Sequence, residues 1–159
     1  MARTTKMGFE TNRRICYDWH NKPETKYGFR FKSQIERKWA DYLQILKDLG
    51  AIISWEYEPK RFSCGHKFGK DRYYTPDFKI VEGEHGIEYE YFEEIKTTLR
   101  QKDISRFKWL KQSFPELIIV LVLPYCANNS KQALLRQQAH KYVQRIVYAN
   151  PLFKQYGIK

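Results

Sequence analysis

The sequence predicts an α/β protein, with a mixed central sheet flanked by helices. Apolar residues at helical spacing in residues 33–50 precede two neighbouring strand patterns, residues 73–80 and 89–97, joined by a short polar turn. The continuous apolar run Leu117–Leu123 has the length of a fully buried strand that is parallel to its neighbour. Together with a strand around Trp55–Glu58, the order becomes helix, three strands, helix, strand, helix, which is typical of helices packed on a sheet.

The first helix is expected to begin after Ser33 and to end at Gly50. Ser33 and Glu36 have the spacing of a capping box, in which the two residues satisfy each other's backbone amides. Apolar residues recur on one side of this helix: Ile35, Trp39, Tyr42, Leu43 and Leu46. Glu36 therefore has two interpretations, as a helix cap and as a carboxylate beside the strands that follow.

The two strands at residues 73–80 and 89–97 are expected to form a hairpin, turning between Gly83 and Gly86. Strand side chains alternate between faces, so Glu94 and Lys96 point to one side, and Asp77 can point there too. Glu93 faces away in a regular strand, although a single bulge would exchange it with Glu94.

Two carboxylates and an ammonium on one face have the chemistry of a metal-dependent phosphodiesterase. Mg²⁺ takes oxygen ligands and keeps several waters, and Mn²⁺ is an alternative ion. Lys96 could orient or deprotonate an attacking water and stabilise charge on a phosphate. The competing interpretation is an ordinary cross-strand ion pair, with Asp77 as a turn residue after Pro76.

The same residues resemble a known signature. Pro76-Asp77 followed by Glu94-Ile95-Lys96 resembles the PD-(D/E)xK motif of the restriction-endonuclease-like nucleases. Within that superfamily, the chain from Ser33 to Leu123 is similar to the junction-resolving endonuclease I family of T-odd phages. The segments that carry this likeness, in order, are Ser33-x-x-Glu36, Leu49-Gly50-Ala51-Ile52, Trp55-Glu56-Tyr57-Glu58, Tyr74-Thr75-Pro76-Asp77-Phe78, Glu94-Ile95-Lys96-Thr97 and Phe114-Pro115-Glu116-Leu117.

The resemblance implies an αβββαβ core and a Mg²⁺-dependent DNA endonuclease that acts on branched DNA. It implies that Glu36, Asp77 and Glu94 bind metal and that Lys96 assists the nucleophilic water. Cutting two strands needs two sites, so we expect a symmetric homodimer. Three features depart from the family pattern: Thr97 replaces a glycine, the connection from Ile80 to Tyr89 is longer, and residues 62–72 form an insert, expected to be a substrate-contacting or solvated loop.

The composition favours a polyanionic partner. Lys and Arg number 29 against 18 Asp and Glu, a formal charge of +11, and nucleic acid is the commonest partner of such a chain. No apolar run reaches the ~18 residues of a membrane span. Three widely spaced cysteines suit a reducing cytoplasm, that of a bacterial or phage-infected cell. The residues expected to contact DNA are Arg13, Arg14, Lys32, Lys67, Lys70, Arg100, Lys102 and Arg106.

The expected organisation is an arm at residues 1–30, a nuclease domain at 31–150 and a tail at 151–159. The arm, basic and aromatic, could track a phosphate backbone or strap the core. A second helix is expected from a cap at Asp103 or Ser105 up to Pro115, and a third over Lys131–Ala149, ended by Pro151.

Two other functions are compatible with these residues. A sequence-specific endonuclease of the restriction, homing or transposon-end type would use the same four site residues. A non-catalytic DNA-binding module would explain the positive charge without cleavage. An RNA target also stays open, since nothing in the sequence reads a 2′-hydroxyl.

Overall fold

The computed structural model describes residues 26–67, 70–84 and 86–159. The chain divides into two units, Met1–Gln34 and Ile35–Lys159. In the described part of the first unit, the rings of Tyr27, Phe29 and Phe31 contact one another, with centroids 5.2 to 6.1 Å apart. Most of the expected arm, including Arg13 and Arg14, lies outside the described residues.

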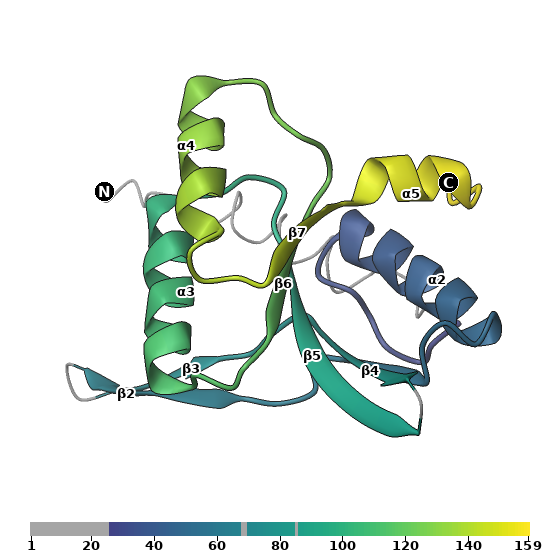
Figure 1. Ribbon diagram of the computed structural model, residues 1–159, viewed down its shortest axis with the longest axis horizontal. Helices are drawn as coiled ribbons and strands as arrows, with labels where there is room; N and C mark the ends of the chain where they lie inside the picture. Colours follow the sequence, from purple (N-terminus) through teal and green to yellow (C-terminus); the bar gives the residue numbers. More distant parts are fainter. Residues whose placement is uncertain (1–25, 68–69, 85) are drawn as a thin grey trace, which may run out of the picture. The chain divides into compact units, whose positions relative to one another are not determined.

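The second unit is built on a mixed five-stranded sheet, in the order β1-β4-β5-β6-β7 (Figure 1). Its first two pairings, β1 with β4 and β4 with β5, are antiparallel, and the next two, β5 with β6 and β6 with β7, are parallel. The strands are β1 (Ser54–Tyr57), β4 (Phe78–Glu84), β5 (Ile87–Ile95), β6 (Ile119–Leu123) and β7 (Arg145–Tyr148). The expected α/β class and mixed sheet are therefore confirmed.

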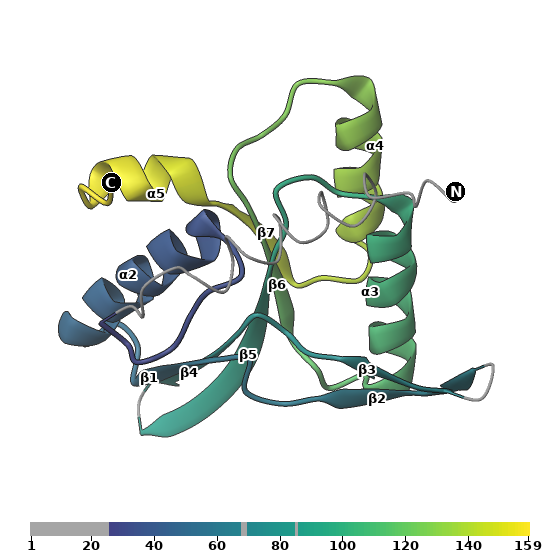
Figure 2. The same ribbon diagram turned by 180° about the vertical axis from the view of Figure 1, so that it is seen from behind.

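Four helices in the described part of the chain cover this sheet from both sides. The helices are α2 (Gln34–Asp48), α3 (Gln101–Ser113), α4 (Ser130–Ala139) and α5 (Ala149–Gln155). Figures 1 and 2 show α3 and α4 on one side of the sheet and α2 and α5 on the other. None of these described helices is long and apolar enough to cross a membrane.

Helix α2 follows the apolar spacing in the sequence. Trp39, Ala40 and Leu43 are buried, and the ring of Trp39 contacts that of Phe153 in α5. Gly50 has a φ of +73°, the left-handed conformation that a glycine adopts without strain after a helix. The expected beginning, buried side and end of this helix are all confirmed.

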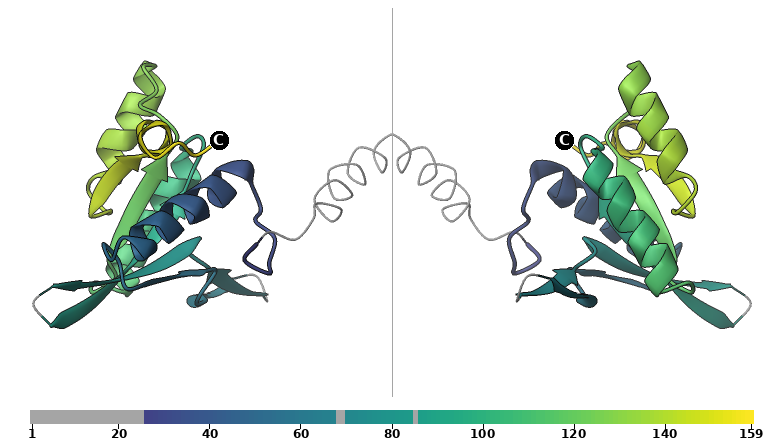
Figure 3. Two further views of the ribbon diagram at one scale, coloured as in Figure 1. Left: turned by 90° about the vertical axis from the view of Figure 1, so that its right-hand side faces the viewer. Right: turned by 90° about the vertical axis from the view of Figure 1, so that its left-hand side faces the viewer.

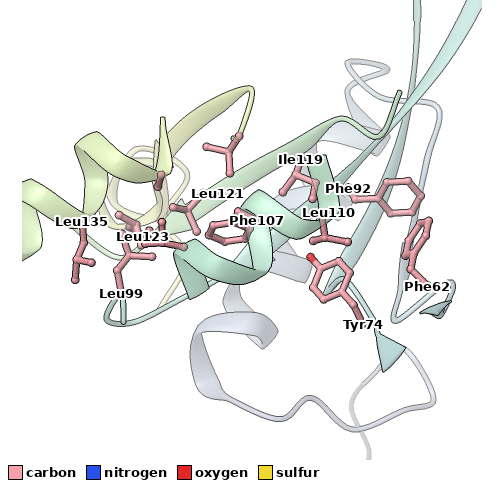
Figure 4. Close-up of a cluster of buried hydrophobic side chains, with 13 residues drawn as sticks. Phe62, Tyr74, Phe92, Leu99, Phe107, Leu110, Ile119, Leu121, Leu123 and Leu135 are labelled. Atoms are coloured by element: carbon pink, nitrogen blue, oxygen red, sulfur yellow. The ribbon is translucent and has the colours of Figure 1, made fainter. Parts of the chain in front are cut away.

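The core on the opposite side of the sheet is shown in Figure 4. Helix α3 joins β5 to the parallel strand β6, and every residue of β6 is buried, as the apolar run predicted. Phe107 and Leu110 of α3 pack over Phe92 of β5 and Leu121 of β6, and the ring of Tyr74 lies in the same cluster. This packing fixes α3 against the end of β5.

The strand predicted over residues 73–80 was wrong, because two strands of different sheets meet there. β3 (Lys70–Tyr74) pairs with β2 (Phe62–Lys67) in a separate two-stranded sheet, and β4 begins at Phe78. Pro76 has no N–H to give to a ladder, so the strand is interrupted where the chain passes from one sheet to the other. The insert at residues 62–72, expected as a loop, is thus mainly a β-hairpin, which extends away from the five-stranded sheet (Figure 3).

Two helix predictions also need correction. The helix over Lys131–Ala149 was wrong: α4 ends at Ala139, and the chain then forms β7 and α5. Ile146, Val147 and Tyr148 favour a strand and find an open edge of β6, while Pro151 lies in the first turn of α5, where its missing N–H costs nothing. The tail at 151–159 is therefore partly helical.

Helix α3 begins earlier than the cap predicted at Asp103 or Ser105. Its first residue is Gln101, and Arg100 occupies the N-cap position. Asp103 still helps to cap the helix, because its Oδ2 accepts a hydrogen bond of 2.9 Å from the amide of Arg100. The sequence signal thus identified a capping carboxylate but placed it at the wrong position.

Candidate active site

Asp77 is held where the ends of three strands meet. Its backbone carbonyl accepts a hydrogen bond of 2.9 Å from the amide of Glu58, just beyond β1. Its Oδ2 accepts a hydrogen bond of 2.7 Å from the amide of Ile95, the last residue of β5. Only 8% of Asp77 is exposed. The residue thus links the beginning of β4 to the end of β5 and keeps its carboxylate buried there.

Glu94 lies at the same end of β5, and its two carboxylate oxygens have different partners. Oε2 accepts a hydrogen bond of 2.8 Å from the hydroxyl of Tyr74. Oε1 forms an ion pair with the ammonium of Lys96 and lies 3.8 Å from a guanidinium nitrogen of Arg106. Glu94 is only 2% exposed. The contact with Lys96 confirms that these two residues face the same side.

Glu36 is the third carboxylate, placed by the first turn of α2. It is buried, and its Oε2 accepts a hydrogen bond of 2.7 Å from the hydroxyl of Tyr57 in β1. Its charge acts on Asp77, because it helps to raise the pKa of that carboxyl. Glu36 is therefore a neighbour of the proposed site, whatever it contributes to the beginning of the helix.

The electrostatics of Asp77 connect all four predicted site residues. Burial, then the nearby Glu94 carboxylate and, to a smaller extent, Glu36 raise the pKa of Asp77, which comes to about 7 in all. The amide of Ile95 and the ammonium of Lys96 act in the opposite direction. A buried carboxyl whose pKa is raised by two other carboxylates is a place where added positive charge would be stabilising.

The donor set suits a hard cation, but the carboxylates do not form a closed ligand cluster. Among the residues that the structure describes, no three His, Cys, Asp or Glu side chains are grouped so that they could hold a metal ion. Glu36, Asp77 and Glu94 each use an oxygen on a hydroxyl or amide of the protein instead. Asp77 and Glu94 together could still hold Mg²⁺, because this ion needs only one or two carboxylates and keeps waters.

Glu93 faces the other side of β5, as strand alternation predicted. β5 and β6 pair residue for residue from Phe92 to Ile95, without a bulge that would exchange Glu93 with Glu94. Glu93 accepts a hydrogen bond from the indole nitrogen of Trp39 in α2. Burial raises the pKa of Glu93 to about 7, while Trp39 and Arg145 lower it.

The predicted DNA-binding residues are distributed over several elements. Arg106 contacts the site directly through Glu94. Arg100 and Lys102 are exposed at the beginning of α3, and Lys32 is exposed in the first unit. Lys67 and Lys70 are paired in the backbone register at the far end of the β2–β3 hairpin.

Two tyrosines of this site were not predicted from the sequence. Tyr74 and Tyr57 each donate a hydroxyl hydrogen bond to one of the carboxylates. Burial, and then the Glu94 carboxylate, raise the pKa of Tyr74 well above its usual value, so it stays protonated and remains a donor. The available signal was that Tyr74 stands three residues before Asp77 in a strand-like segment.

Comparisons with known proteins identify no relative of this chain. No family model matches the chain, and neither the curated proteins nor the solved structures contain a match. The chemistry of the site must therefore carry the functional argument.

Proposed function

We propose that this chain is a Mg²⁺-dependent endodeoxyribonuclease of the PD-(D/E)xK type, which hydrolyses phosphodiester bonds in branched DNA. One observation carries the proposal: two buried carboxylates, Asp77 and Glu94, lie at the ends of neighbouring strands, with the ammonium of Lys96 on Glu94. An ordinary surface ion pair would leave these carboxylates in water. Here burial and mutual repulsion raise the pKa of Asp77 to about 7.

The order of elements supports the superfamily assignment. When the β2–β3 hairpin is set aside as an insertion, the chain runs α2, β1, β4, β5, α3, β6, which is the αβββαβ order expected of these nucleases. Asp77 precedes the second of these core strands, and Glu94 lies at the end of the third. The resemblance in sequence and the order of elements therefore favour the same fold.

Each site residue would have its own role in the hydrolysis. A bound Mg²⁺ would supply an acidified water and compensate charge on the phosphate. Asp77 and Glu94 would hold that ion, and Glu36 would orient a water or hold a second ion. Lys96, an ammonium on Glu94 here, would leave that carboxylate and stabilise the negative charge on the phosphoryl oxygens, or, once it has lost its own proton to solvent, take the proton of the attacking water. The water oxygen would bond to phosphorus as the phosphorus–oxygen ester bond breaks, and a solvent water would protonate the leaving oxygen.

DNA as substrate is supported by the formal charge of +11 and by the exposed side chains of Arg100 and Lys102 near the beginning of α3. The preference for branched DNA comes from the resemblance to the junction-resolving family. Cutting both strands of a junction would require two copies of the site, so we include a symmetric homodimer in the proposal. A phage-infected or bacterial cytoplasm is the corresponding compartment.

The decisive experiment compares three DNA substrates: a four-way junction, a linear duplex of matched sequence and bacterial genomic DNA. Each is incubated with the wild-type protein or Asp77→Asn, in Mg²⁺ and in EDTA. We expect nicking of the junction in Mg²⁺, none in EDTA, and none with the variant. The substitution keeps the shape of the side chain and its amide contact to Ile95, so a loss would report the charge.

Other outcomes would redirect or overturn the proposal. Discrete cuts in linear DNA, lost in Asp77→Asn, would keep the metal site and replace branched DNA with a sequence-specific target. Binding of all substrates without cleavage, and equal in both proteins, would overturn the enzyme and leave a DNA-binding module. If none of the three DNA substrates is cut but a structured RNA added to the same assay is, the substrate changes while the chemistry stays.

A further inference from the structure

Arg106 of α3 contacts the site at two points. Its guanidinium lies over the ring of Tyr74, 5.9 Å from the ring centroid, and one of its nitrogens is 3.8 Å from Oε1 of Glu94. The ring of Tyr74 is buried, and its hydroxyl holds the other oxygen of Glu94. The Arg106 side chain is nevertheless 40% exposed. The guanidinium of Arg106 therefore contacts Tyr74 and Glu94, while part of the side chain remains accessible to solvent.

Arg106 and Lys96 share one carboxylate oxygen. Both contact Oε1 of Glu94, whereas Oε2 is used by Tyr74. A divalent cation that took Oε1 would face two positive side chains at close range, and like charges in a buried site repel strongly. Cation binding at Glu94 therefore competes with the contacts of Lys96 and Arg106 with that oxygen.

We propose that Arg106 is a phosphate-binding residue of this site, and that Glu94 withholds it from phosphate until a divalent cation takes the carboxylate. The ligand class is a phosphodiester, which offers two anionic oxygens to the planar fork of a guanidinium. The inference rests on the proposed function, because it takes Glu94 as a cation ligand. It adds the order of events: the cation binds first, and Arg106 then becomes available.

The surroundings of Arg106 favour a short movement over a long one. Phe107 and Leu110, its neighbours on α3, are almost completely buried in the core, so the helix backbone is fixed. The ring of Tyr74 offers a face along which the guanidinium can slide while it keeps a cation–π contact. Released from Glu94, Arg106 would stay within the site. Cation and phosphodiester should then bind with positive coupling, which is reciprocal by linkage.

The test measures binding rather than cleavage. A fluorescent DNA duplex is titrated with protein in EDTA and in Ca²⁺, a hard cation that takes the same oxygen ligands, and anisotropy gives the affinity. We expect Arg106→Ala to weaken binding roughly tenfold in Ca²⁺, a typical coupling, and to change it little in EDTA. Lys102→Ala is the matched control: it removes an exposed charge one turn earlier on α3 and should weaken binding by the same factor in both conditions.

A second set of variants tests whether Arg106 can bind phosphate without a cation once Glu94 has lost its charge. Glu94→Gln deletes the charge that holds Arg106, so Arg106 should be available to phosphate even in EDTA. Adding Arg106→Ala to Glu94→Gln should then weaken binding roughly tenfold in EDTA, whereas the same change in the wild type should not. Arg106→Lys retains the charge without the planar fork and should give intermediate binding. Urea unfolding of each variant shows that it is folded.

The outcomes separate this inference from the proposed function. Equal losses for Arg106→Ala in EDTA, in Ca²⁺ and in the Glu94→Gln background would overturn the withholding by Glu94. No loss in any of them would overturn phosphate binding by Arg106. If the Glu94→Gln arm behaves as expected but Ca²⁺ has no effect on the wild type, Arg106 stands as a phosphate contact and the proposed metal site fails.

Discussion

Glu93 and Glu94 are adjacent residues of one strand, equally buried, in opposite chemical surroundings. Their exposed fractions are 3% and 2%. Glu93 faces α2 and accepts one hydrogen bond from the indole of Trp39. Glu94 faces the opposite side and is surrounded by the hydroxyl of Tyr74, the ammonium of Lys96 and the guanidinium of Arg106.

The difference shows that burial alone does not mark a functional carboxylate. On the α2 side the charge of Glu93 has one hydrogen-bond donor among the described residues, Trp39, with Arg145 acting on it electrostatically, and its burial costs stability. On the other side the charge of Glu94 meets two cations that are themselves partly exposed and can be exchanged for others. The distinguishing feature of the proposed site is thus the direct ion pairing of its carboxylate with two partly exposed cations.

The largest expected effect is a difference in cleavage rate between variants of Glu94 and of Glu93. Glu94→Gln should lower the Mg²⁺-dependent cleavage of a four-way junction by at least roughly a hundredfold, since even groups that only support metal ligands are worth 10–100-fold. Glu93→Gln should leave the rate within a few-fold, because the amide oxygen can still accept from Trp39. Equal losses in the two variants would mean that the site depends on the strand rather than on Glu94.

A second prediction concerns stability and pH. The pKa of Glu93 is about 7 in the folded protein and near 4.5 when unfolded, so the folded state binds more protons between these values. Stability therefore falls as pH rises from about 4.5 to about 7, and levels off above that. Each pKa unit corresponds to about 1.4 kcal/mol, so the buried charge of Glu93 costs a few kcal/mol at pH 8.

Glu93→Gln should remove that cost. The free energy of unfolding in urea should exceed that of the wild type by up to a few kcal/mol at pH 8, and the two proteins should be similar at pH 4.5. Both proteins keep a further decrease in stability over the same pH range from Asp77, whose pKa is also raised to about 7. An identical pH profile in both proteins would show that Glu93 is not a buried charge.

The sequence predicted this pair because strand alternation is a strong local rule. Residues 87–95 form a regular strand, so the separation of Glu93 from Glu94 followed from period two alone. The spacing of Glu94 and Lys96, the apolar side of α2 and the buried strand β6 were readable for the same reason. Each is fixed by a few neighbouring residues.

The failures came where partners distant in sequence decide the structure. Residues 145–148 form a strand because β6 offers them an edge, although a helical pattern also fits them. Tyr74 belongs to the β2–β3 sheet, yet its hydroxyl reaches Glu94 of another sheet. Arg106 was predicted as a DNA-contacting residue, and its contact with Glu94 depends on how α3 packs. No local pattern encodes such contacts.

The smallest expected effects concern the hydrogen-bond donors of the two carboxylates. Trp39→Phe removes the donor to Glu93, and Tyr74→Phe removes the donor to Glu94. Double-mutant cycles with Glu93→Gln and Glu94→Gln, measured by urea unfolding, should give coupling energies of roughly 1 kcal/mol, the difference between a hydrogen bond to a charged acceptor and one to the neutral amide that replaces it.

Mg²⁺ should then distinguish the two pairs. The coupling of Tyr74 with Glu94 should change when Mg²⁺ is added, because a bound cation neutralises the carboxylate that accepts the bond. The coupling of Trp39 with Glu93 should stay the same, since Glu93 faces the other side of the strand from Glu94, where the ion is proposed to bind. If both couplings respond equally to Mg²⁺, the ion acts on the whole fold and not at Glu94. If neither responds, Glu94 is not a cation ligand, and the chemical difference between these neighbouring carboxylates is structural only.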